Sequence, residues 1–275
     1  MSDVVLKAGV MGWPVEHSLS PRLHGYWLER AHIKGSYLPL AVVPNDLSNA
    51  LKSLKENGYR GVNLTVPHKE AAMAIVDDID DIARRVGAIN TVVVCEDGSL
   101  EGRNTDAYGF SQNLLSAQFQ HQDRPAVILG AGGAARAAIV ALMDLGVPEI
   151  RILNRTEDKA QNLAREFGSR LSAYALSNVD ALKDASLLVN ATSLGLKGQP
   201  PLEIFLGTLP VGALVTDMVY APLMTDLLKR AAARGNKVVD GLGMLLHQAR
   251  PAFKAFYGVD PEVTPSLRSY VLEGT

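Results

Sequence analysis

The chain has 275 residues, a length typical of one large domain or of two domains of ordinary size. Hydrophobic residues make up 47 % and charged residues 20 %, which is typical of a globular protein with apolar material for two cores. The formal net charge of -2 argues against broad electrostatic attraction to nucleic acid or to an anionic membrane. Cys95 is the single cysteine, so an internal disulfide is excluded, and its apolar surroundings predict burial.

The first residues lack the apolar core of a signal peptide, and no apolar stretch reaches the length of a membrane span. These features, with the lone cysteine, predict a soluble protein of the cytoplasm. We expect a small-molecule substrate, and neither nucleic acid nor membrane as a partner. The sequence does not fix the oligomeric state, and a homodimer is the assembly to test.

Apolar runs bounded by turn residues alternate with helical patterns along the first hundred residues. Three such runs predict strands, over 4–12, 36–43 and 60–66. Helical spacing of apolar residues is found after Pro21 and over 45–58, where an Asn or Asp cap and a Gly stop frame the segment. Pro67 is expected to open a further helix. The segments 88–95 and 99–104 flank a Glu-Asp-Gly turn and predict a hairpin.

A second series of strands and helices follows a helix that is predicted over 105–118. Five apolar runs predict its strands, over 124–130, 149–154, 185–192, 213–219 and 237–241. Helical patterns cover four more segments, from the glycine-rich loop to Leu145 and over 156–168, 241–258 and 261–274. The polar, Pro/Gly-rich segment 193–201 is expected to be a mobile loop.

Alternating β and α segments predict parallel sheets with helices on both faces. The expected fold class is therefore α/β: two α/β domains with a cleft between them, the second a Rossmann-type dinucleotide-binding domain. We place a substrate-binding catalytic domain at 1–104 plus 241–275, and an NADP-binding Rossmann domain at 105–240. The chain is expected to return to the first domain because two long helical patterns, near 106–118 and 242–257, link the halves.

A glycine-rich loop, "LGAGGAARAA", ends the predicted strand 124–130. Gly130, Gly132 and Ala135 fit the fingerprint G-x-G-x-x-G/A. Such glycines let the backbone approach a pyrophosphate, and the helix N-terminus supplies unpaired N–H groups. The alternative is a purely structural turn, but the apolar strand before it and the alanine-rich helix after it favour a dinucleotide.

A little over twenty residues later, an NAD-binding chain usually has Asp or Glu for the ribose hydroxyls. Here Asn154, Arg155 and Thr156 occupy that position. Arg can hold a 2′-phosphate through a charge-assisted fork, and the two neutral side chains add hydrogen bonds. The alternatives are a solvated Arg155 and a Thr156 that only caps the next helix; for Thr156 we expect both roles. This half therefore indicates NADP.

A second loop of the same half, "NATSLG", follows the strand predicted over 185–192. Ligands collect at the carboxyl ends of strands in open α/β sheets. We therefore expect this loop, which contains Thr192, to contact the nicotinamide side of the cofactor. An ordinary polar loop is the alternative.

Two stretches of the first half combine small polar groups. Ser18 and Ser20 face the same way if their segment is extended. Asn63 and Thr65 share one side of a predicted strand, and Lys69 is expected in the first turn of the next helix. A cation is electrostatically disfavoured there, which hints at a functional role for Lys69.

A third polar stretch places Asn104, Thr105 and Asp106 before a predicted helix. Thr105 or Asp106 serving only as an N-cap is the alternative reading. Hydroxyls, amides, one Lys and one Asp suit a small polyhydroxylated acid. No cluster of His, Cys or carboxylates has metal-ligand spacing, so we expect no metal.

The histidines are weaker candidates for the chemistry. His17 and His68 are acid–base candidates by residue type, but better-placed polar groups stand beside both. His24 and His247 are expected to be structural.

Nine ordered blocks of sequence carry a resemblance: "GWPVEHSLSPRLH", "GVNLTVPHKE", "GAINTV", "GRNTDAYG", "GAGGAARA", "NRT", "NATSLG", "DMVYAPLMT" and "GLGMLLHQA". In these blocks the chain resembles the shikimate dehydrogenase family nearly from end to end. The resemblance implies reversible NADPH-dependent reduction of 3-dehydroshikimate to shikimate, in chorismate and aromatic amino-acid biosynthesis.

The resemblance also implies roles at matching positions. Lys69 and Asp106 match the family's catalytic pair, and Ser18 and Ser20 match the serines that hold the substrate carboxylate. Contacts to substrate hydroxyls or to the catalytic Lys are implied for Asn63, Thr65, Asn90 and Gln248, and Tyr220 is implied to approach the substrate. Cofactor contacts are implied for Gly130, Ala131, Gly132, Gly133, Ala134, Asn154, Arg155, Thr156 and Thr192, and nicotinamide-pocket positions for Met218, Gly241 and Met244.

In the implied reaction, hydride passes between nicotinamide C4 and substrate C3. Lys69 moves the proton of the C3 oxygen, and Asp106 orients Lys69. Two departures bear on fine substrate preference: Gly25 stands where the family often has Asn, and Ala107 where Gly is usual. Two alternatives are an NAD-using quinate/shikimate dehydrogenase, which Arg155 disfavours, and a non-catalytic NADPH-binding regulatory protein.

Overall fold

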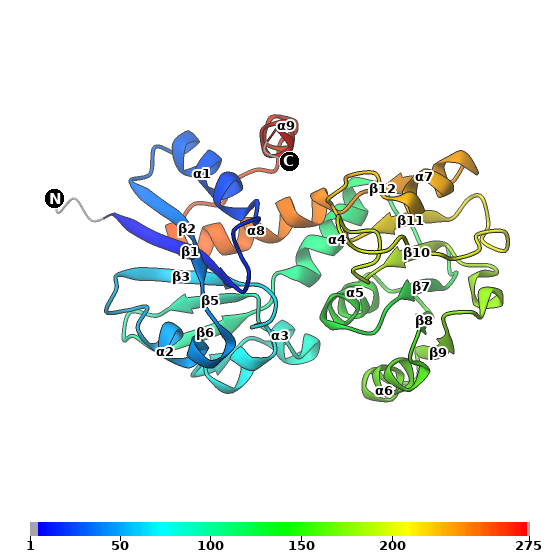
Figure 1. Cartoon of the computed structure of the whole chain (residues 1–275), viewed down its shortest axis with the longest axis horizontal. Coiled ribbons are helices and arrows are strands. Elements are labelled where there is room, and N and C mark those ends of the chain that lie inside the picture. Colours follow the sequence, from blue (N-terminus) through cyan, green and yellow to red (C-terminus); the bar gives the residue numbers. More distant parts are fainter. Residues whose placement is uncertain (1–4, 274–275) are drawn as a thin grey trace. The chain divides into compact units, whose positions relative to one another are not determined.

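A computed structural model describes residues 5–273 (Figure 1). The chain divides into two compact units, Met1–Tyr108 with Leu246–Thr275, and Gly109–Leu245. The chain passes between the units within two helices, α4 (Asp106–Ser116) and α8 (Leu242–Tyr257). No helix among residues 5–273 is long and apolar enough to cross a membrane.

The first unit contains a mixed sheet in the order β2-β1-β3-β5-β6-β4. Its strands are β1 (Leu6–Gly12), β2 (Gly35–Ala41), β3 (Tyr59–Leu64), β4 (Asp78–Ile79), β5 (Thr91–Val94) and β6 (Leu100–Arg103). β1 pairs in parallel with β2 and β3, whereas β5 is antiparallel to β3 and to β6. The hairpin predicted around the Glu-Asp-Gly turn is therefore confirmed. The first predicted strand began at Val4, which lies outside the described residues.

The helical segments of this unit are shorter than the sequence suggests. They are α1 (Ser20–Arg30), α2 (Leu47–Lys52), α3 (Asp81–Val86), α9 (Pro265–Leu272) and the 3-10 turns η1 (Pro44–Asp46) and η2 (Ala71–Ala74). The helix predicted over 45–58 ends at Lys52, and no side-chain bond from Asp46 caps it in the described chain. The Ser53 hydroxyl bonds to the Ala50 carbonyl, the Asn57 side chain bonds to the Ser53 carbonyl, and residues 53–58 form turns. The last predicted helix extended to Gly274, outside the described residues.

The prediction that a helix opens at Pro67 is wrong. Residues 66–70 form turns, and only the 3-10 segment η2 follows. Lys69 therefore lies in a turn and not in the first turn of a helix. The dipole argument for a functional Lys69 does not apply, so its role must rest on its contacts.

The two faces of the first sheet are covered by different elements. Val62 and Leu64 of β3 join the core beneath α2, η2 and α3. Their neighbours in the strand, Gly61 and Asn63, face the other way, because strand side chains alternate. A Cβ on Gly61 would collide with the Phe256 ring of α8. Asn63 thus lies on the α1–α8 face, where an aromatic cluster fills the interior.

The second unit contains a parallel sheet in the order β12-β11-β10-β7-β8-β9. Its strands are β7 (Ala126–Leu129), β8 (Ile150–Asn154), β9 (Leu171–Ala175), β10 (Leu187–Asn190), β11 (Leu214–Asp217) and β12 (Val238–Val239). Numbered within this unit, the order is 6-5-4-1-2-3, that of a Rossmann fold, with the switch point between β7 and β10. The predicted α/β class with a Rossmann-type second unit is confirmed.

The helices of the second unit are α5 (Gly133–Asp144), α6 (Glu157–Phe167), α7 (Asp226–Ala233) and the 3-10 turn η3 (Val179–Leu182). Among the strands and α-helices of this unit, β9 and α7 were not predicted. β9 is an edge strand with mostly half-buried residues, so it lacks the apolar run of its neighbours. α7 does show helical spacing of Leu227, Leu228 and Ala231, and a Thr225 cap, which could have revealed it. Cys95, expected to be buried, is half-buried just after β5.

Candidate functional site

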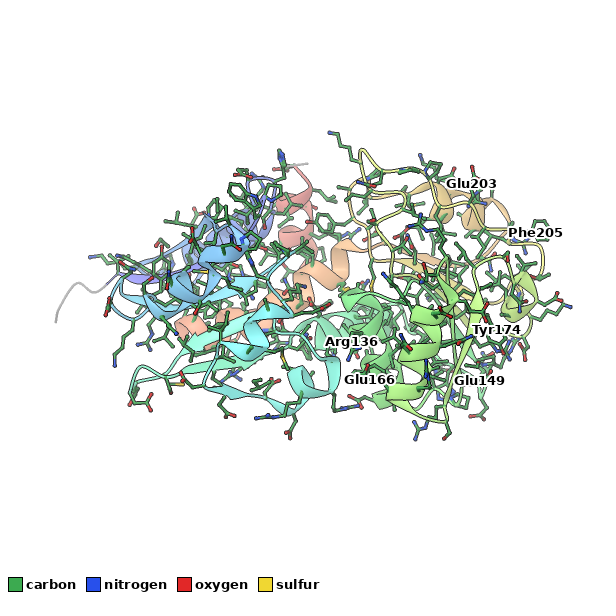
Figure 2. The ribbon with its side chains drawn as sticks, turned by 60° about the horizontal axis from the view of Figure 1, so that its bottom comes forward. Arg136, Glu149, Glu166, Tyr174, Glu203 and Phe205 are labelled. Atoms are coloured by element: carbon green, nitrogen blue, oxygen red, sulfur yellow. The ribbon has the colours of Figure 1, made fainter. Side chains whose placement is uncertain are left out.

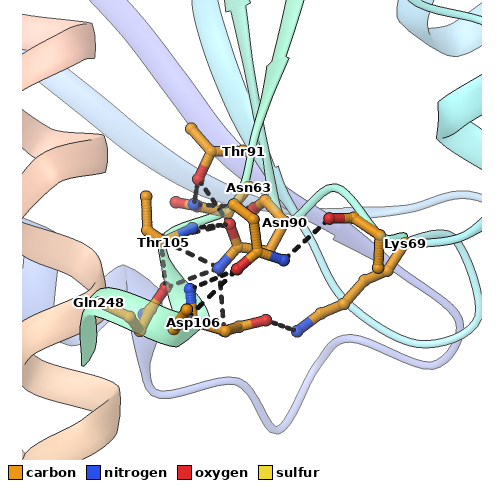
Figure 3. A network of polar contacts seen from close by, with 10 residues as sticks. Asn63, Lys69, Asn90, Thr91, Thr105, Asp106 and Gln248 are labelled. Carbon is orange, nitrogen blue, oxygen red and sulfur yellow. Dashed lines mark hydrogen bonds and ion pairs between the residues drawn. The ribbon is translucent and has the colours of Figure 1, made fainter. Parts of the chain in front are cut away.

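The Lys69 side chain contacts the Asp106 carboxylate. Lys69 Nζ donates to Asp106 Oδ2 across 2.7 Å (Figure 3). The Lys69 side chain is 30 % exposed and the Asp106 side chain 15 %, so the pair is shielded yet reachable. The turn that carries Lys69 is tied to the neighbouring segment, because the Ile89 N–H donates to the Lys69 carbonyl across 2.8 Å. The predicted closeness of this pair is therefore a feature of the structure.

Asn104, and neither Thr105 nor Asp106, caps α4. Asn104 Oδ1 accepts from the N–H groups of Asp106 (3.0 Å) and Ala107 (3.3 Å). Asn104 Nδ2 donates to the Ala88 carbonyl at 2.8 Å and thereby fixes the cap. The N-cap reading of Thr105 or Asp106 is wrong, and the Asp106 carboxylate is left for other partners.

Asn90 holds the second oxygen of that carboxylate. The Thr105 N–H donates to Asn90 Oδ1 at 2.8 Å, which turns Asn90 Nδ2 toward Asp106 Oδ1 at 2.9 Å. Asn90 Nδ2 also lies 3.4 Å from Gln248 Oε1 of α8. Asp106 thus accepts from Asn90 on one oxygen and from Lys69 on the other (Figure 3). The family resemblance gave Asn90 a contact with substrate or with Lys69; its amide here acts on Asp106.

The amide nitrogen of Asn63 uses both of its protons in hydrogen bonds. Asn63 Nδ2 donates to the Asn90 carbonyl (3.1 Å) and to Thr91 Oγ1 (2.9 Å). Its oxygen accepts from the Tyr37 hydroxyl at 2.7 Å. Because both amide protons are used, Asn63 has only a lone pair of Oδ1 to offer a ligand. Thr65, just beyond β3, is half-buried, and its hydroxyl has no hydrogen-bond partner within residues 5–273.

Ser18 and Ser20 do not lie in an extended segment as assumed. Residues 16 and 17 form a turn, residue 19 is a bend, and Ser20 is the first residue of α1. The Ser20 N–H donates to Ser18 Oγ at 3.3 Å, so the turn still brings the two serines together. Two neighbouring hydroxyl donors without a full charge suit a carboxylate ligand.

The histidines of the first unit show no arrangement for proton transfer. His17 is exposed. His68 is 1 % exposed, and its Nε2 donates to the Val42 carbonyl at 2.8 Å, which is a structural role. Burial lowers the pKa of His24 to about 3, so that ring stays neutral. Burial, and then Arg250, lower the pKa of His247.

In the second unit, the glycine-rich loop lies at the switch point of the sheet. Gly130 follows β7 with a φ of 108°, which favours glycine. A Cβ there would lie 2.9 Å from Thr192 Cγ2 and 3.1 Å from the Ala191 carbonyl oxygen, so glycine lets the loops after β7 and β10 approach each other. Gly132 precedes α5, and a Cβ there would meet nothing within 4 Å. Residues 131–134 are all partly or fully exposed, which fits a phosphate-binding loop.

Asn154, Arg155 and Thr156 lie where β8 leads into α6. Thr156 occupies the N-cap position, as predicted, although its hydroxyl makes no capping bond in the described chain. Asn154 Nδ2 donates to the Thr156 carbonyl at 2.8 Å and holds the turn. The Arg155 side chain is exposed and has no partner within residues 5–273. The Arg155 guanidinium and the Thr156 hydroxyl are both available to a phosphate.

Another cation, Arg136, follows the glycine-rich loop closely in the sequence and is already paired. Arg136 of α5 forms two hydrogen bonds with Glu166 of α6, one of them from Nη1 at 2.8 Å (Figure 2). Its guanidinium also lies 5.3 Å from the centre of the Phe167 ring. Arg136 therefore ties α5 to α6, in contrast to the exposed Arg155.

A buried carboxylate that the sequence did not single out organises the "NATSLG" loop. Asp217 Oδ1 accepts from Asn190 Nδ2 and from the Val219 N–H, both at 2.9 Å, and Asp217 Oδ2 accepts from Thr225 Oγ1 at 2.7 Å. Asn190 Oδ1 in turn accepts from Thr192 Oγ1 at 2.7 Å. Burial raises the pKa of Asp217, although these hydrogen bonds oppose the shift. An Asp at the end of an apolar strand was the available signal.

The remaining predicted positions have varied surroundings. A Cβ on Gly241 would lie 2.6 Å from the Met218 carbonyl oxygen, so glycine is required by close approach of backbone. Met218, Tyr220 and Met244 are half-buried, and burial raises the pKa of Tyr220. Of the two departures from the family pattern, Gly25 is exposed and Ala107 is buried. No group of three or more His, Cys, Asp or Glu in the described part of the chain could hold a metal.

The Rossmann-ordered sheet with its open glycine-rich loop defines the second unit as that of a dinucleotide-binding α/β protein. Two family profiles match the chain: "Shikimate dehydrogenase substrate binding domain" over residues 10–92 and "Shikimate / quinate 5-dehydrogenase" over residues 113–195. A relative from Paramagnetospirillum magneticum, named shikimate dehydrogenase (NADP(+)), is 53 % identical over 99 % of this chain and 100 % of its own. The chain belongs to the shikimate dehydrogenase family, as its sequence blocks predicted.

Solved structures agree with this assignment. The shikimate 5-dehydrogenase of Thermus thermophilus, in complex with NADP(H) and shikimate, has a TM-score of 0.90 and 39 % identity, over 98 % of this chain and 100 % of its own. The quinate dehydrogenase of Corynebacterium glutamicum, in complex with NAD, has a TM-score of 0.91 and 28 % identity, over 98 % of this chain and 99 % of its own. The fold is therefore shared by enzymes that differ in substrate and cofactor.

Proposed function

We propose that this chain catalyses the reversible, NADPH-dependent reduction of 3-dehydroshikimate to shikimate, a step of chorismate and aromatic amino-acid biosynthesis. The single observation that carries the proposal is the Lys69–Asp106 contact of 2.7 Å, held in a buried amide network, in a member of the shikimate dehydrogenase family. In this proposal the first unit binds the substrate, and the Rossmann-type unit binds NADP.

The substrate side uses neutral hydroxyls for binding. Ser18 and Ser20 would donate to the substrate carboxylate, since their hydroxyls share one turn. The hydroxyl of Thr65 would bind a ring hydroxyl, and Asn63 Oδ1 would accept from another. Tyr220 and Gln248 complete the set of proposed substrate contacts.

The proton chemistry centres on Lys69. When bound, the reduced nicotinamide supplies the hydride that C3 receives. Lys69 donates a proton to the C3 oxygen in reduction and accepts it in oxidation. An ammonium has three protons, and only one faces Asp106, so the others remain for a substrate oxygen. Asp106 orients Lys69, and Asn90 orients Asp106 through its second oxygen.

On the cofactor side, different residues would bind the dinucleotide and distinguish NADP from NAD. Residues 130–134 would bind the pyrophosphate, and Thr192, Met218, Gly241 and Met244 would lie on the nicotinamide side. Arg155, with Asn154 and Thr156, would hold the 2′-phosphate that distinguishes NADP from NAD. The exposed Arg155 guanidinium, which has no partner within residues 5–273, is free to bind this phosphate.

One assay tests this function: the purified chain is given shikimate or quinate with NADP or NAD, and reduction of the nicotinamide is followed in all four pairings. We expect the shikimate–NADP pairing to be the fastest. A faster quinate–NAD pairing would instead make the chain an NAD-using quinate dehydrogenase. No turnover in any pairing would favour a non-catalytic NADPH-binding protein.

A homodimer in the cytoplasm is the assembly that we propose from the sequence. Light scattering of the purified chain tests the dimer directly, since it distinguishes the mass of one chain from twice that mass.

A further inference from the structure

The Tyr37 hydroxyl lies between two proposed substrate-binding residues. Tyr37 is in β2, is 5 % exposed, and donates from its hydroxyl to Asn63 Oδ1 across 2.7 Å. The Ser20 side chain lies close to the same phenol, and its hydroxyl opposes the rise in the Tyr37 pKa. Ser20 and Asn63 come from different elements, α1 and β3, so Tyr37 connects them from a third.

The direction of the hydrogen bond between Tyr37 and Asn63 follows from the number of protons. Asn63 Nδ2 already donates to the Asn90 carbonyl and to Thr91 Oγ1, so Asn63 Oδ1 faces Tyr37 as an acceptor. The single phenolic proton is therefore used on Asn63. The lone pairs of the Tyr37 oxygen remain for the nearby Ser20 hydroxyl. Tyr37 thus sets the direction of the Asn63 amide and offers an acceptor to the Ser20 hydroxyl.

The Tyr37 ring is held in place by its neighbours. His24 stacks on it with ring centres 3.8 Å apart and an interplanar angle of 12°. His24 packs in turn against Phe253, with ring centres 5.7 Å apart. Burial raises the pKa of Tyr37 well above its ordinary value, so the phenol keeps its proton at working pH. A fixed ring with a permanent donor is suited to orienting other groups.

We propose that Tyr37 is a positioning residue of the substrate site, which acts through Ser20 and Asn63 and raises the affinity for shikimate. The proposal rests on the proposed function, because it names the substrate that Ser20 and Asn63 would bind. When substrate binds, Tyr37 keeps Asn63 Oδ1 directed as an acceptor. Nicotinamide binding involves other residues and should not depend on Tyr37.

Tyr37→Phe tests this role with little disturbance, since Phe fills nearly the same volume. Asn63 Oδ1 loses its buried donor, and the Ser20 hydroxyl loses the acceptor that orients it. We expect the KM for shikimate to rise about tenfold, the KM for NADP to stay within about twofold, and kcat to change by less than about threefold.

Tyr257→Phe is the matched control. Tyr257 belongs to the same aromatic cluster, with its ring centre 4.6 Å from that of Phe253, but its hydroxyl donates to the Ser36 carbonyl at 2.8 Å. Both variants lose one largely buried phenolic hydrogen bond, so their melting temperatures should fall by similar amounts. Only Tyr37→Phe should raise the KM for shikimate. An equal KM for shikimate in the two variants would overturn the proposal.

A double-mutant cycle with Ser20→Ala tests the proposed route. If Tyr37 acts partly through Ser20, then Tyr37→Phe should raise the KM for shikimate by a smaller factor in the Ser20→Ala background. Fully independent effects would contradict that route. Turnover of shikimate by the unaltered chain is measured first, because it tests the proposed function separately from the role of Tyr37.

Discussion

Lys69 Nζ lies 2.7 Å from Asp106 Oδ2, and the two residues are 37 positions apart in the sequence. The contact depends on a turn after β3 and on the first residue of α4. Each side is fixed separately, Lys69 by the Ile89 N–H and Asp106 by the Asn90 amide. Because both partners are held in place, this ion pair keeps a defined orientation. An exposed ion pair, by contrast, contributes little to stability.

Asp106→Asn should slow turnover. The amide cannot supply the carboxylate charge beside Lys69, and it presents N–H groups to Asn90 Nδ2 or to Lys69, which are donors themselves. Loss of a charge-assisted contact corresponds to a drop in kcat of about tenfold to a hundredfold. In the double variant with Lys69→Ala the losses should not multiply, because the two residues act as a unit. Fully multiplicative losses in steady-state kinetics would contradict a shared role.

Arg155→Ala should weaken NADPH much more than NADH. The exposed guanidinium is proposed to bind the 2′-phosphate, a group that NADH lacks. Its removal should raise the Kd for NADPH by about tenfold to a hundredfold, with little change for NADH. Fluorescence titration measures both constants. Arg165→Ala is the control, because it removes an exposed arginine that lies in α6. An unchanged ratio of the Kd values for NADPH and NADH in Arg155→Ala would mean that Arg155 is an ordinary surface residue.

Replacement of Ser18 and Ser20 together by Ala should raise the KM for shikimate and leave NADPH affinity nearly intact. Both hydroxyls are proposed donors to the substrate carboxylate, each worth about a few-fold to tenfold in affinity. Ser53→Ala, which removes a serine hydroxyl that bonds to the Ala50 carbonyl, serves as the control. An equal loss of NADPH affinity in the double variant would mean that the serines support the fold and not the ligand.

Asp217→Asn should change how stability depends on pH. Burial raises the pKa of Asp217 above its ordinary value of 3.8, so the folded chain binds this proton more tightly than the unfolded chain. The stability that the proton contributes is present below pH 3.8 and is lost as pH rises through the folded pKa. Asn has no such titration, so the free energy of unfolding of the variant relative to the unaltered chain should improve as pH rises through this window. Urea unfolding at several acidic pH values measures it, and a pH-independent difference would contradict the shift.

The sequence identified the alternating elements and the polar stretches, because apolar runs, glycines and caps are local signals. It misplaced Lys69 in a helix, since the turn that holds Lys69 depends on the Ile89 N–H, twenty positions away. Tyr37 escaped notice because its hydroxyl meets Asn63 only after β2 and β3 take their places on either side of β1. Contacts of this kind depend on register and packing, which a single sequence does not display.

The half that was predicted best is the Rossmann-type unit. Its strands are continuous apolar runs because both faces of a parallel sheet are covered, and each run is readily visible. The errors there were local: the edge strand β9 and the helix α7 were missed. Asp217 was overlooked because a carboxylate at a strand end has no distinctive spacing, although it orients the loop of Thr192 through Asn190.

The steady-state kinetics of Lys69→Ala, with shikimate and NADP, test the central claim most directly. Removal of a proton-transfer group should lower kcat by about 10²- to 10⁴-fold with a modest change in the KM for shikimate. Lys183→Ala is the matched control, because Lys183 forms an ion pair of 2.8 Å with Asp180 on an exposed surface, and its turnover should be unchanged. A near-normal kcat in Lys69→Ala, with only a raised KM for shikimate, would mean that Lys69 holds the substrate and does not move the proton.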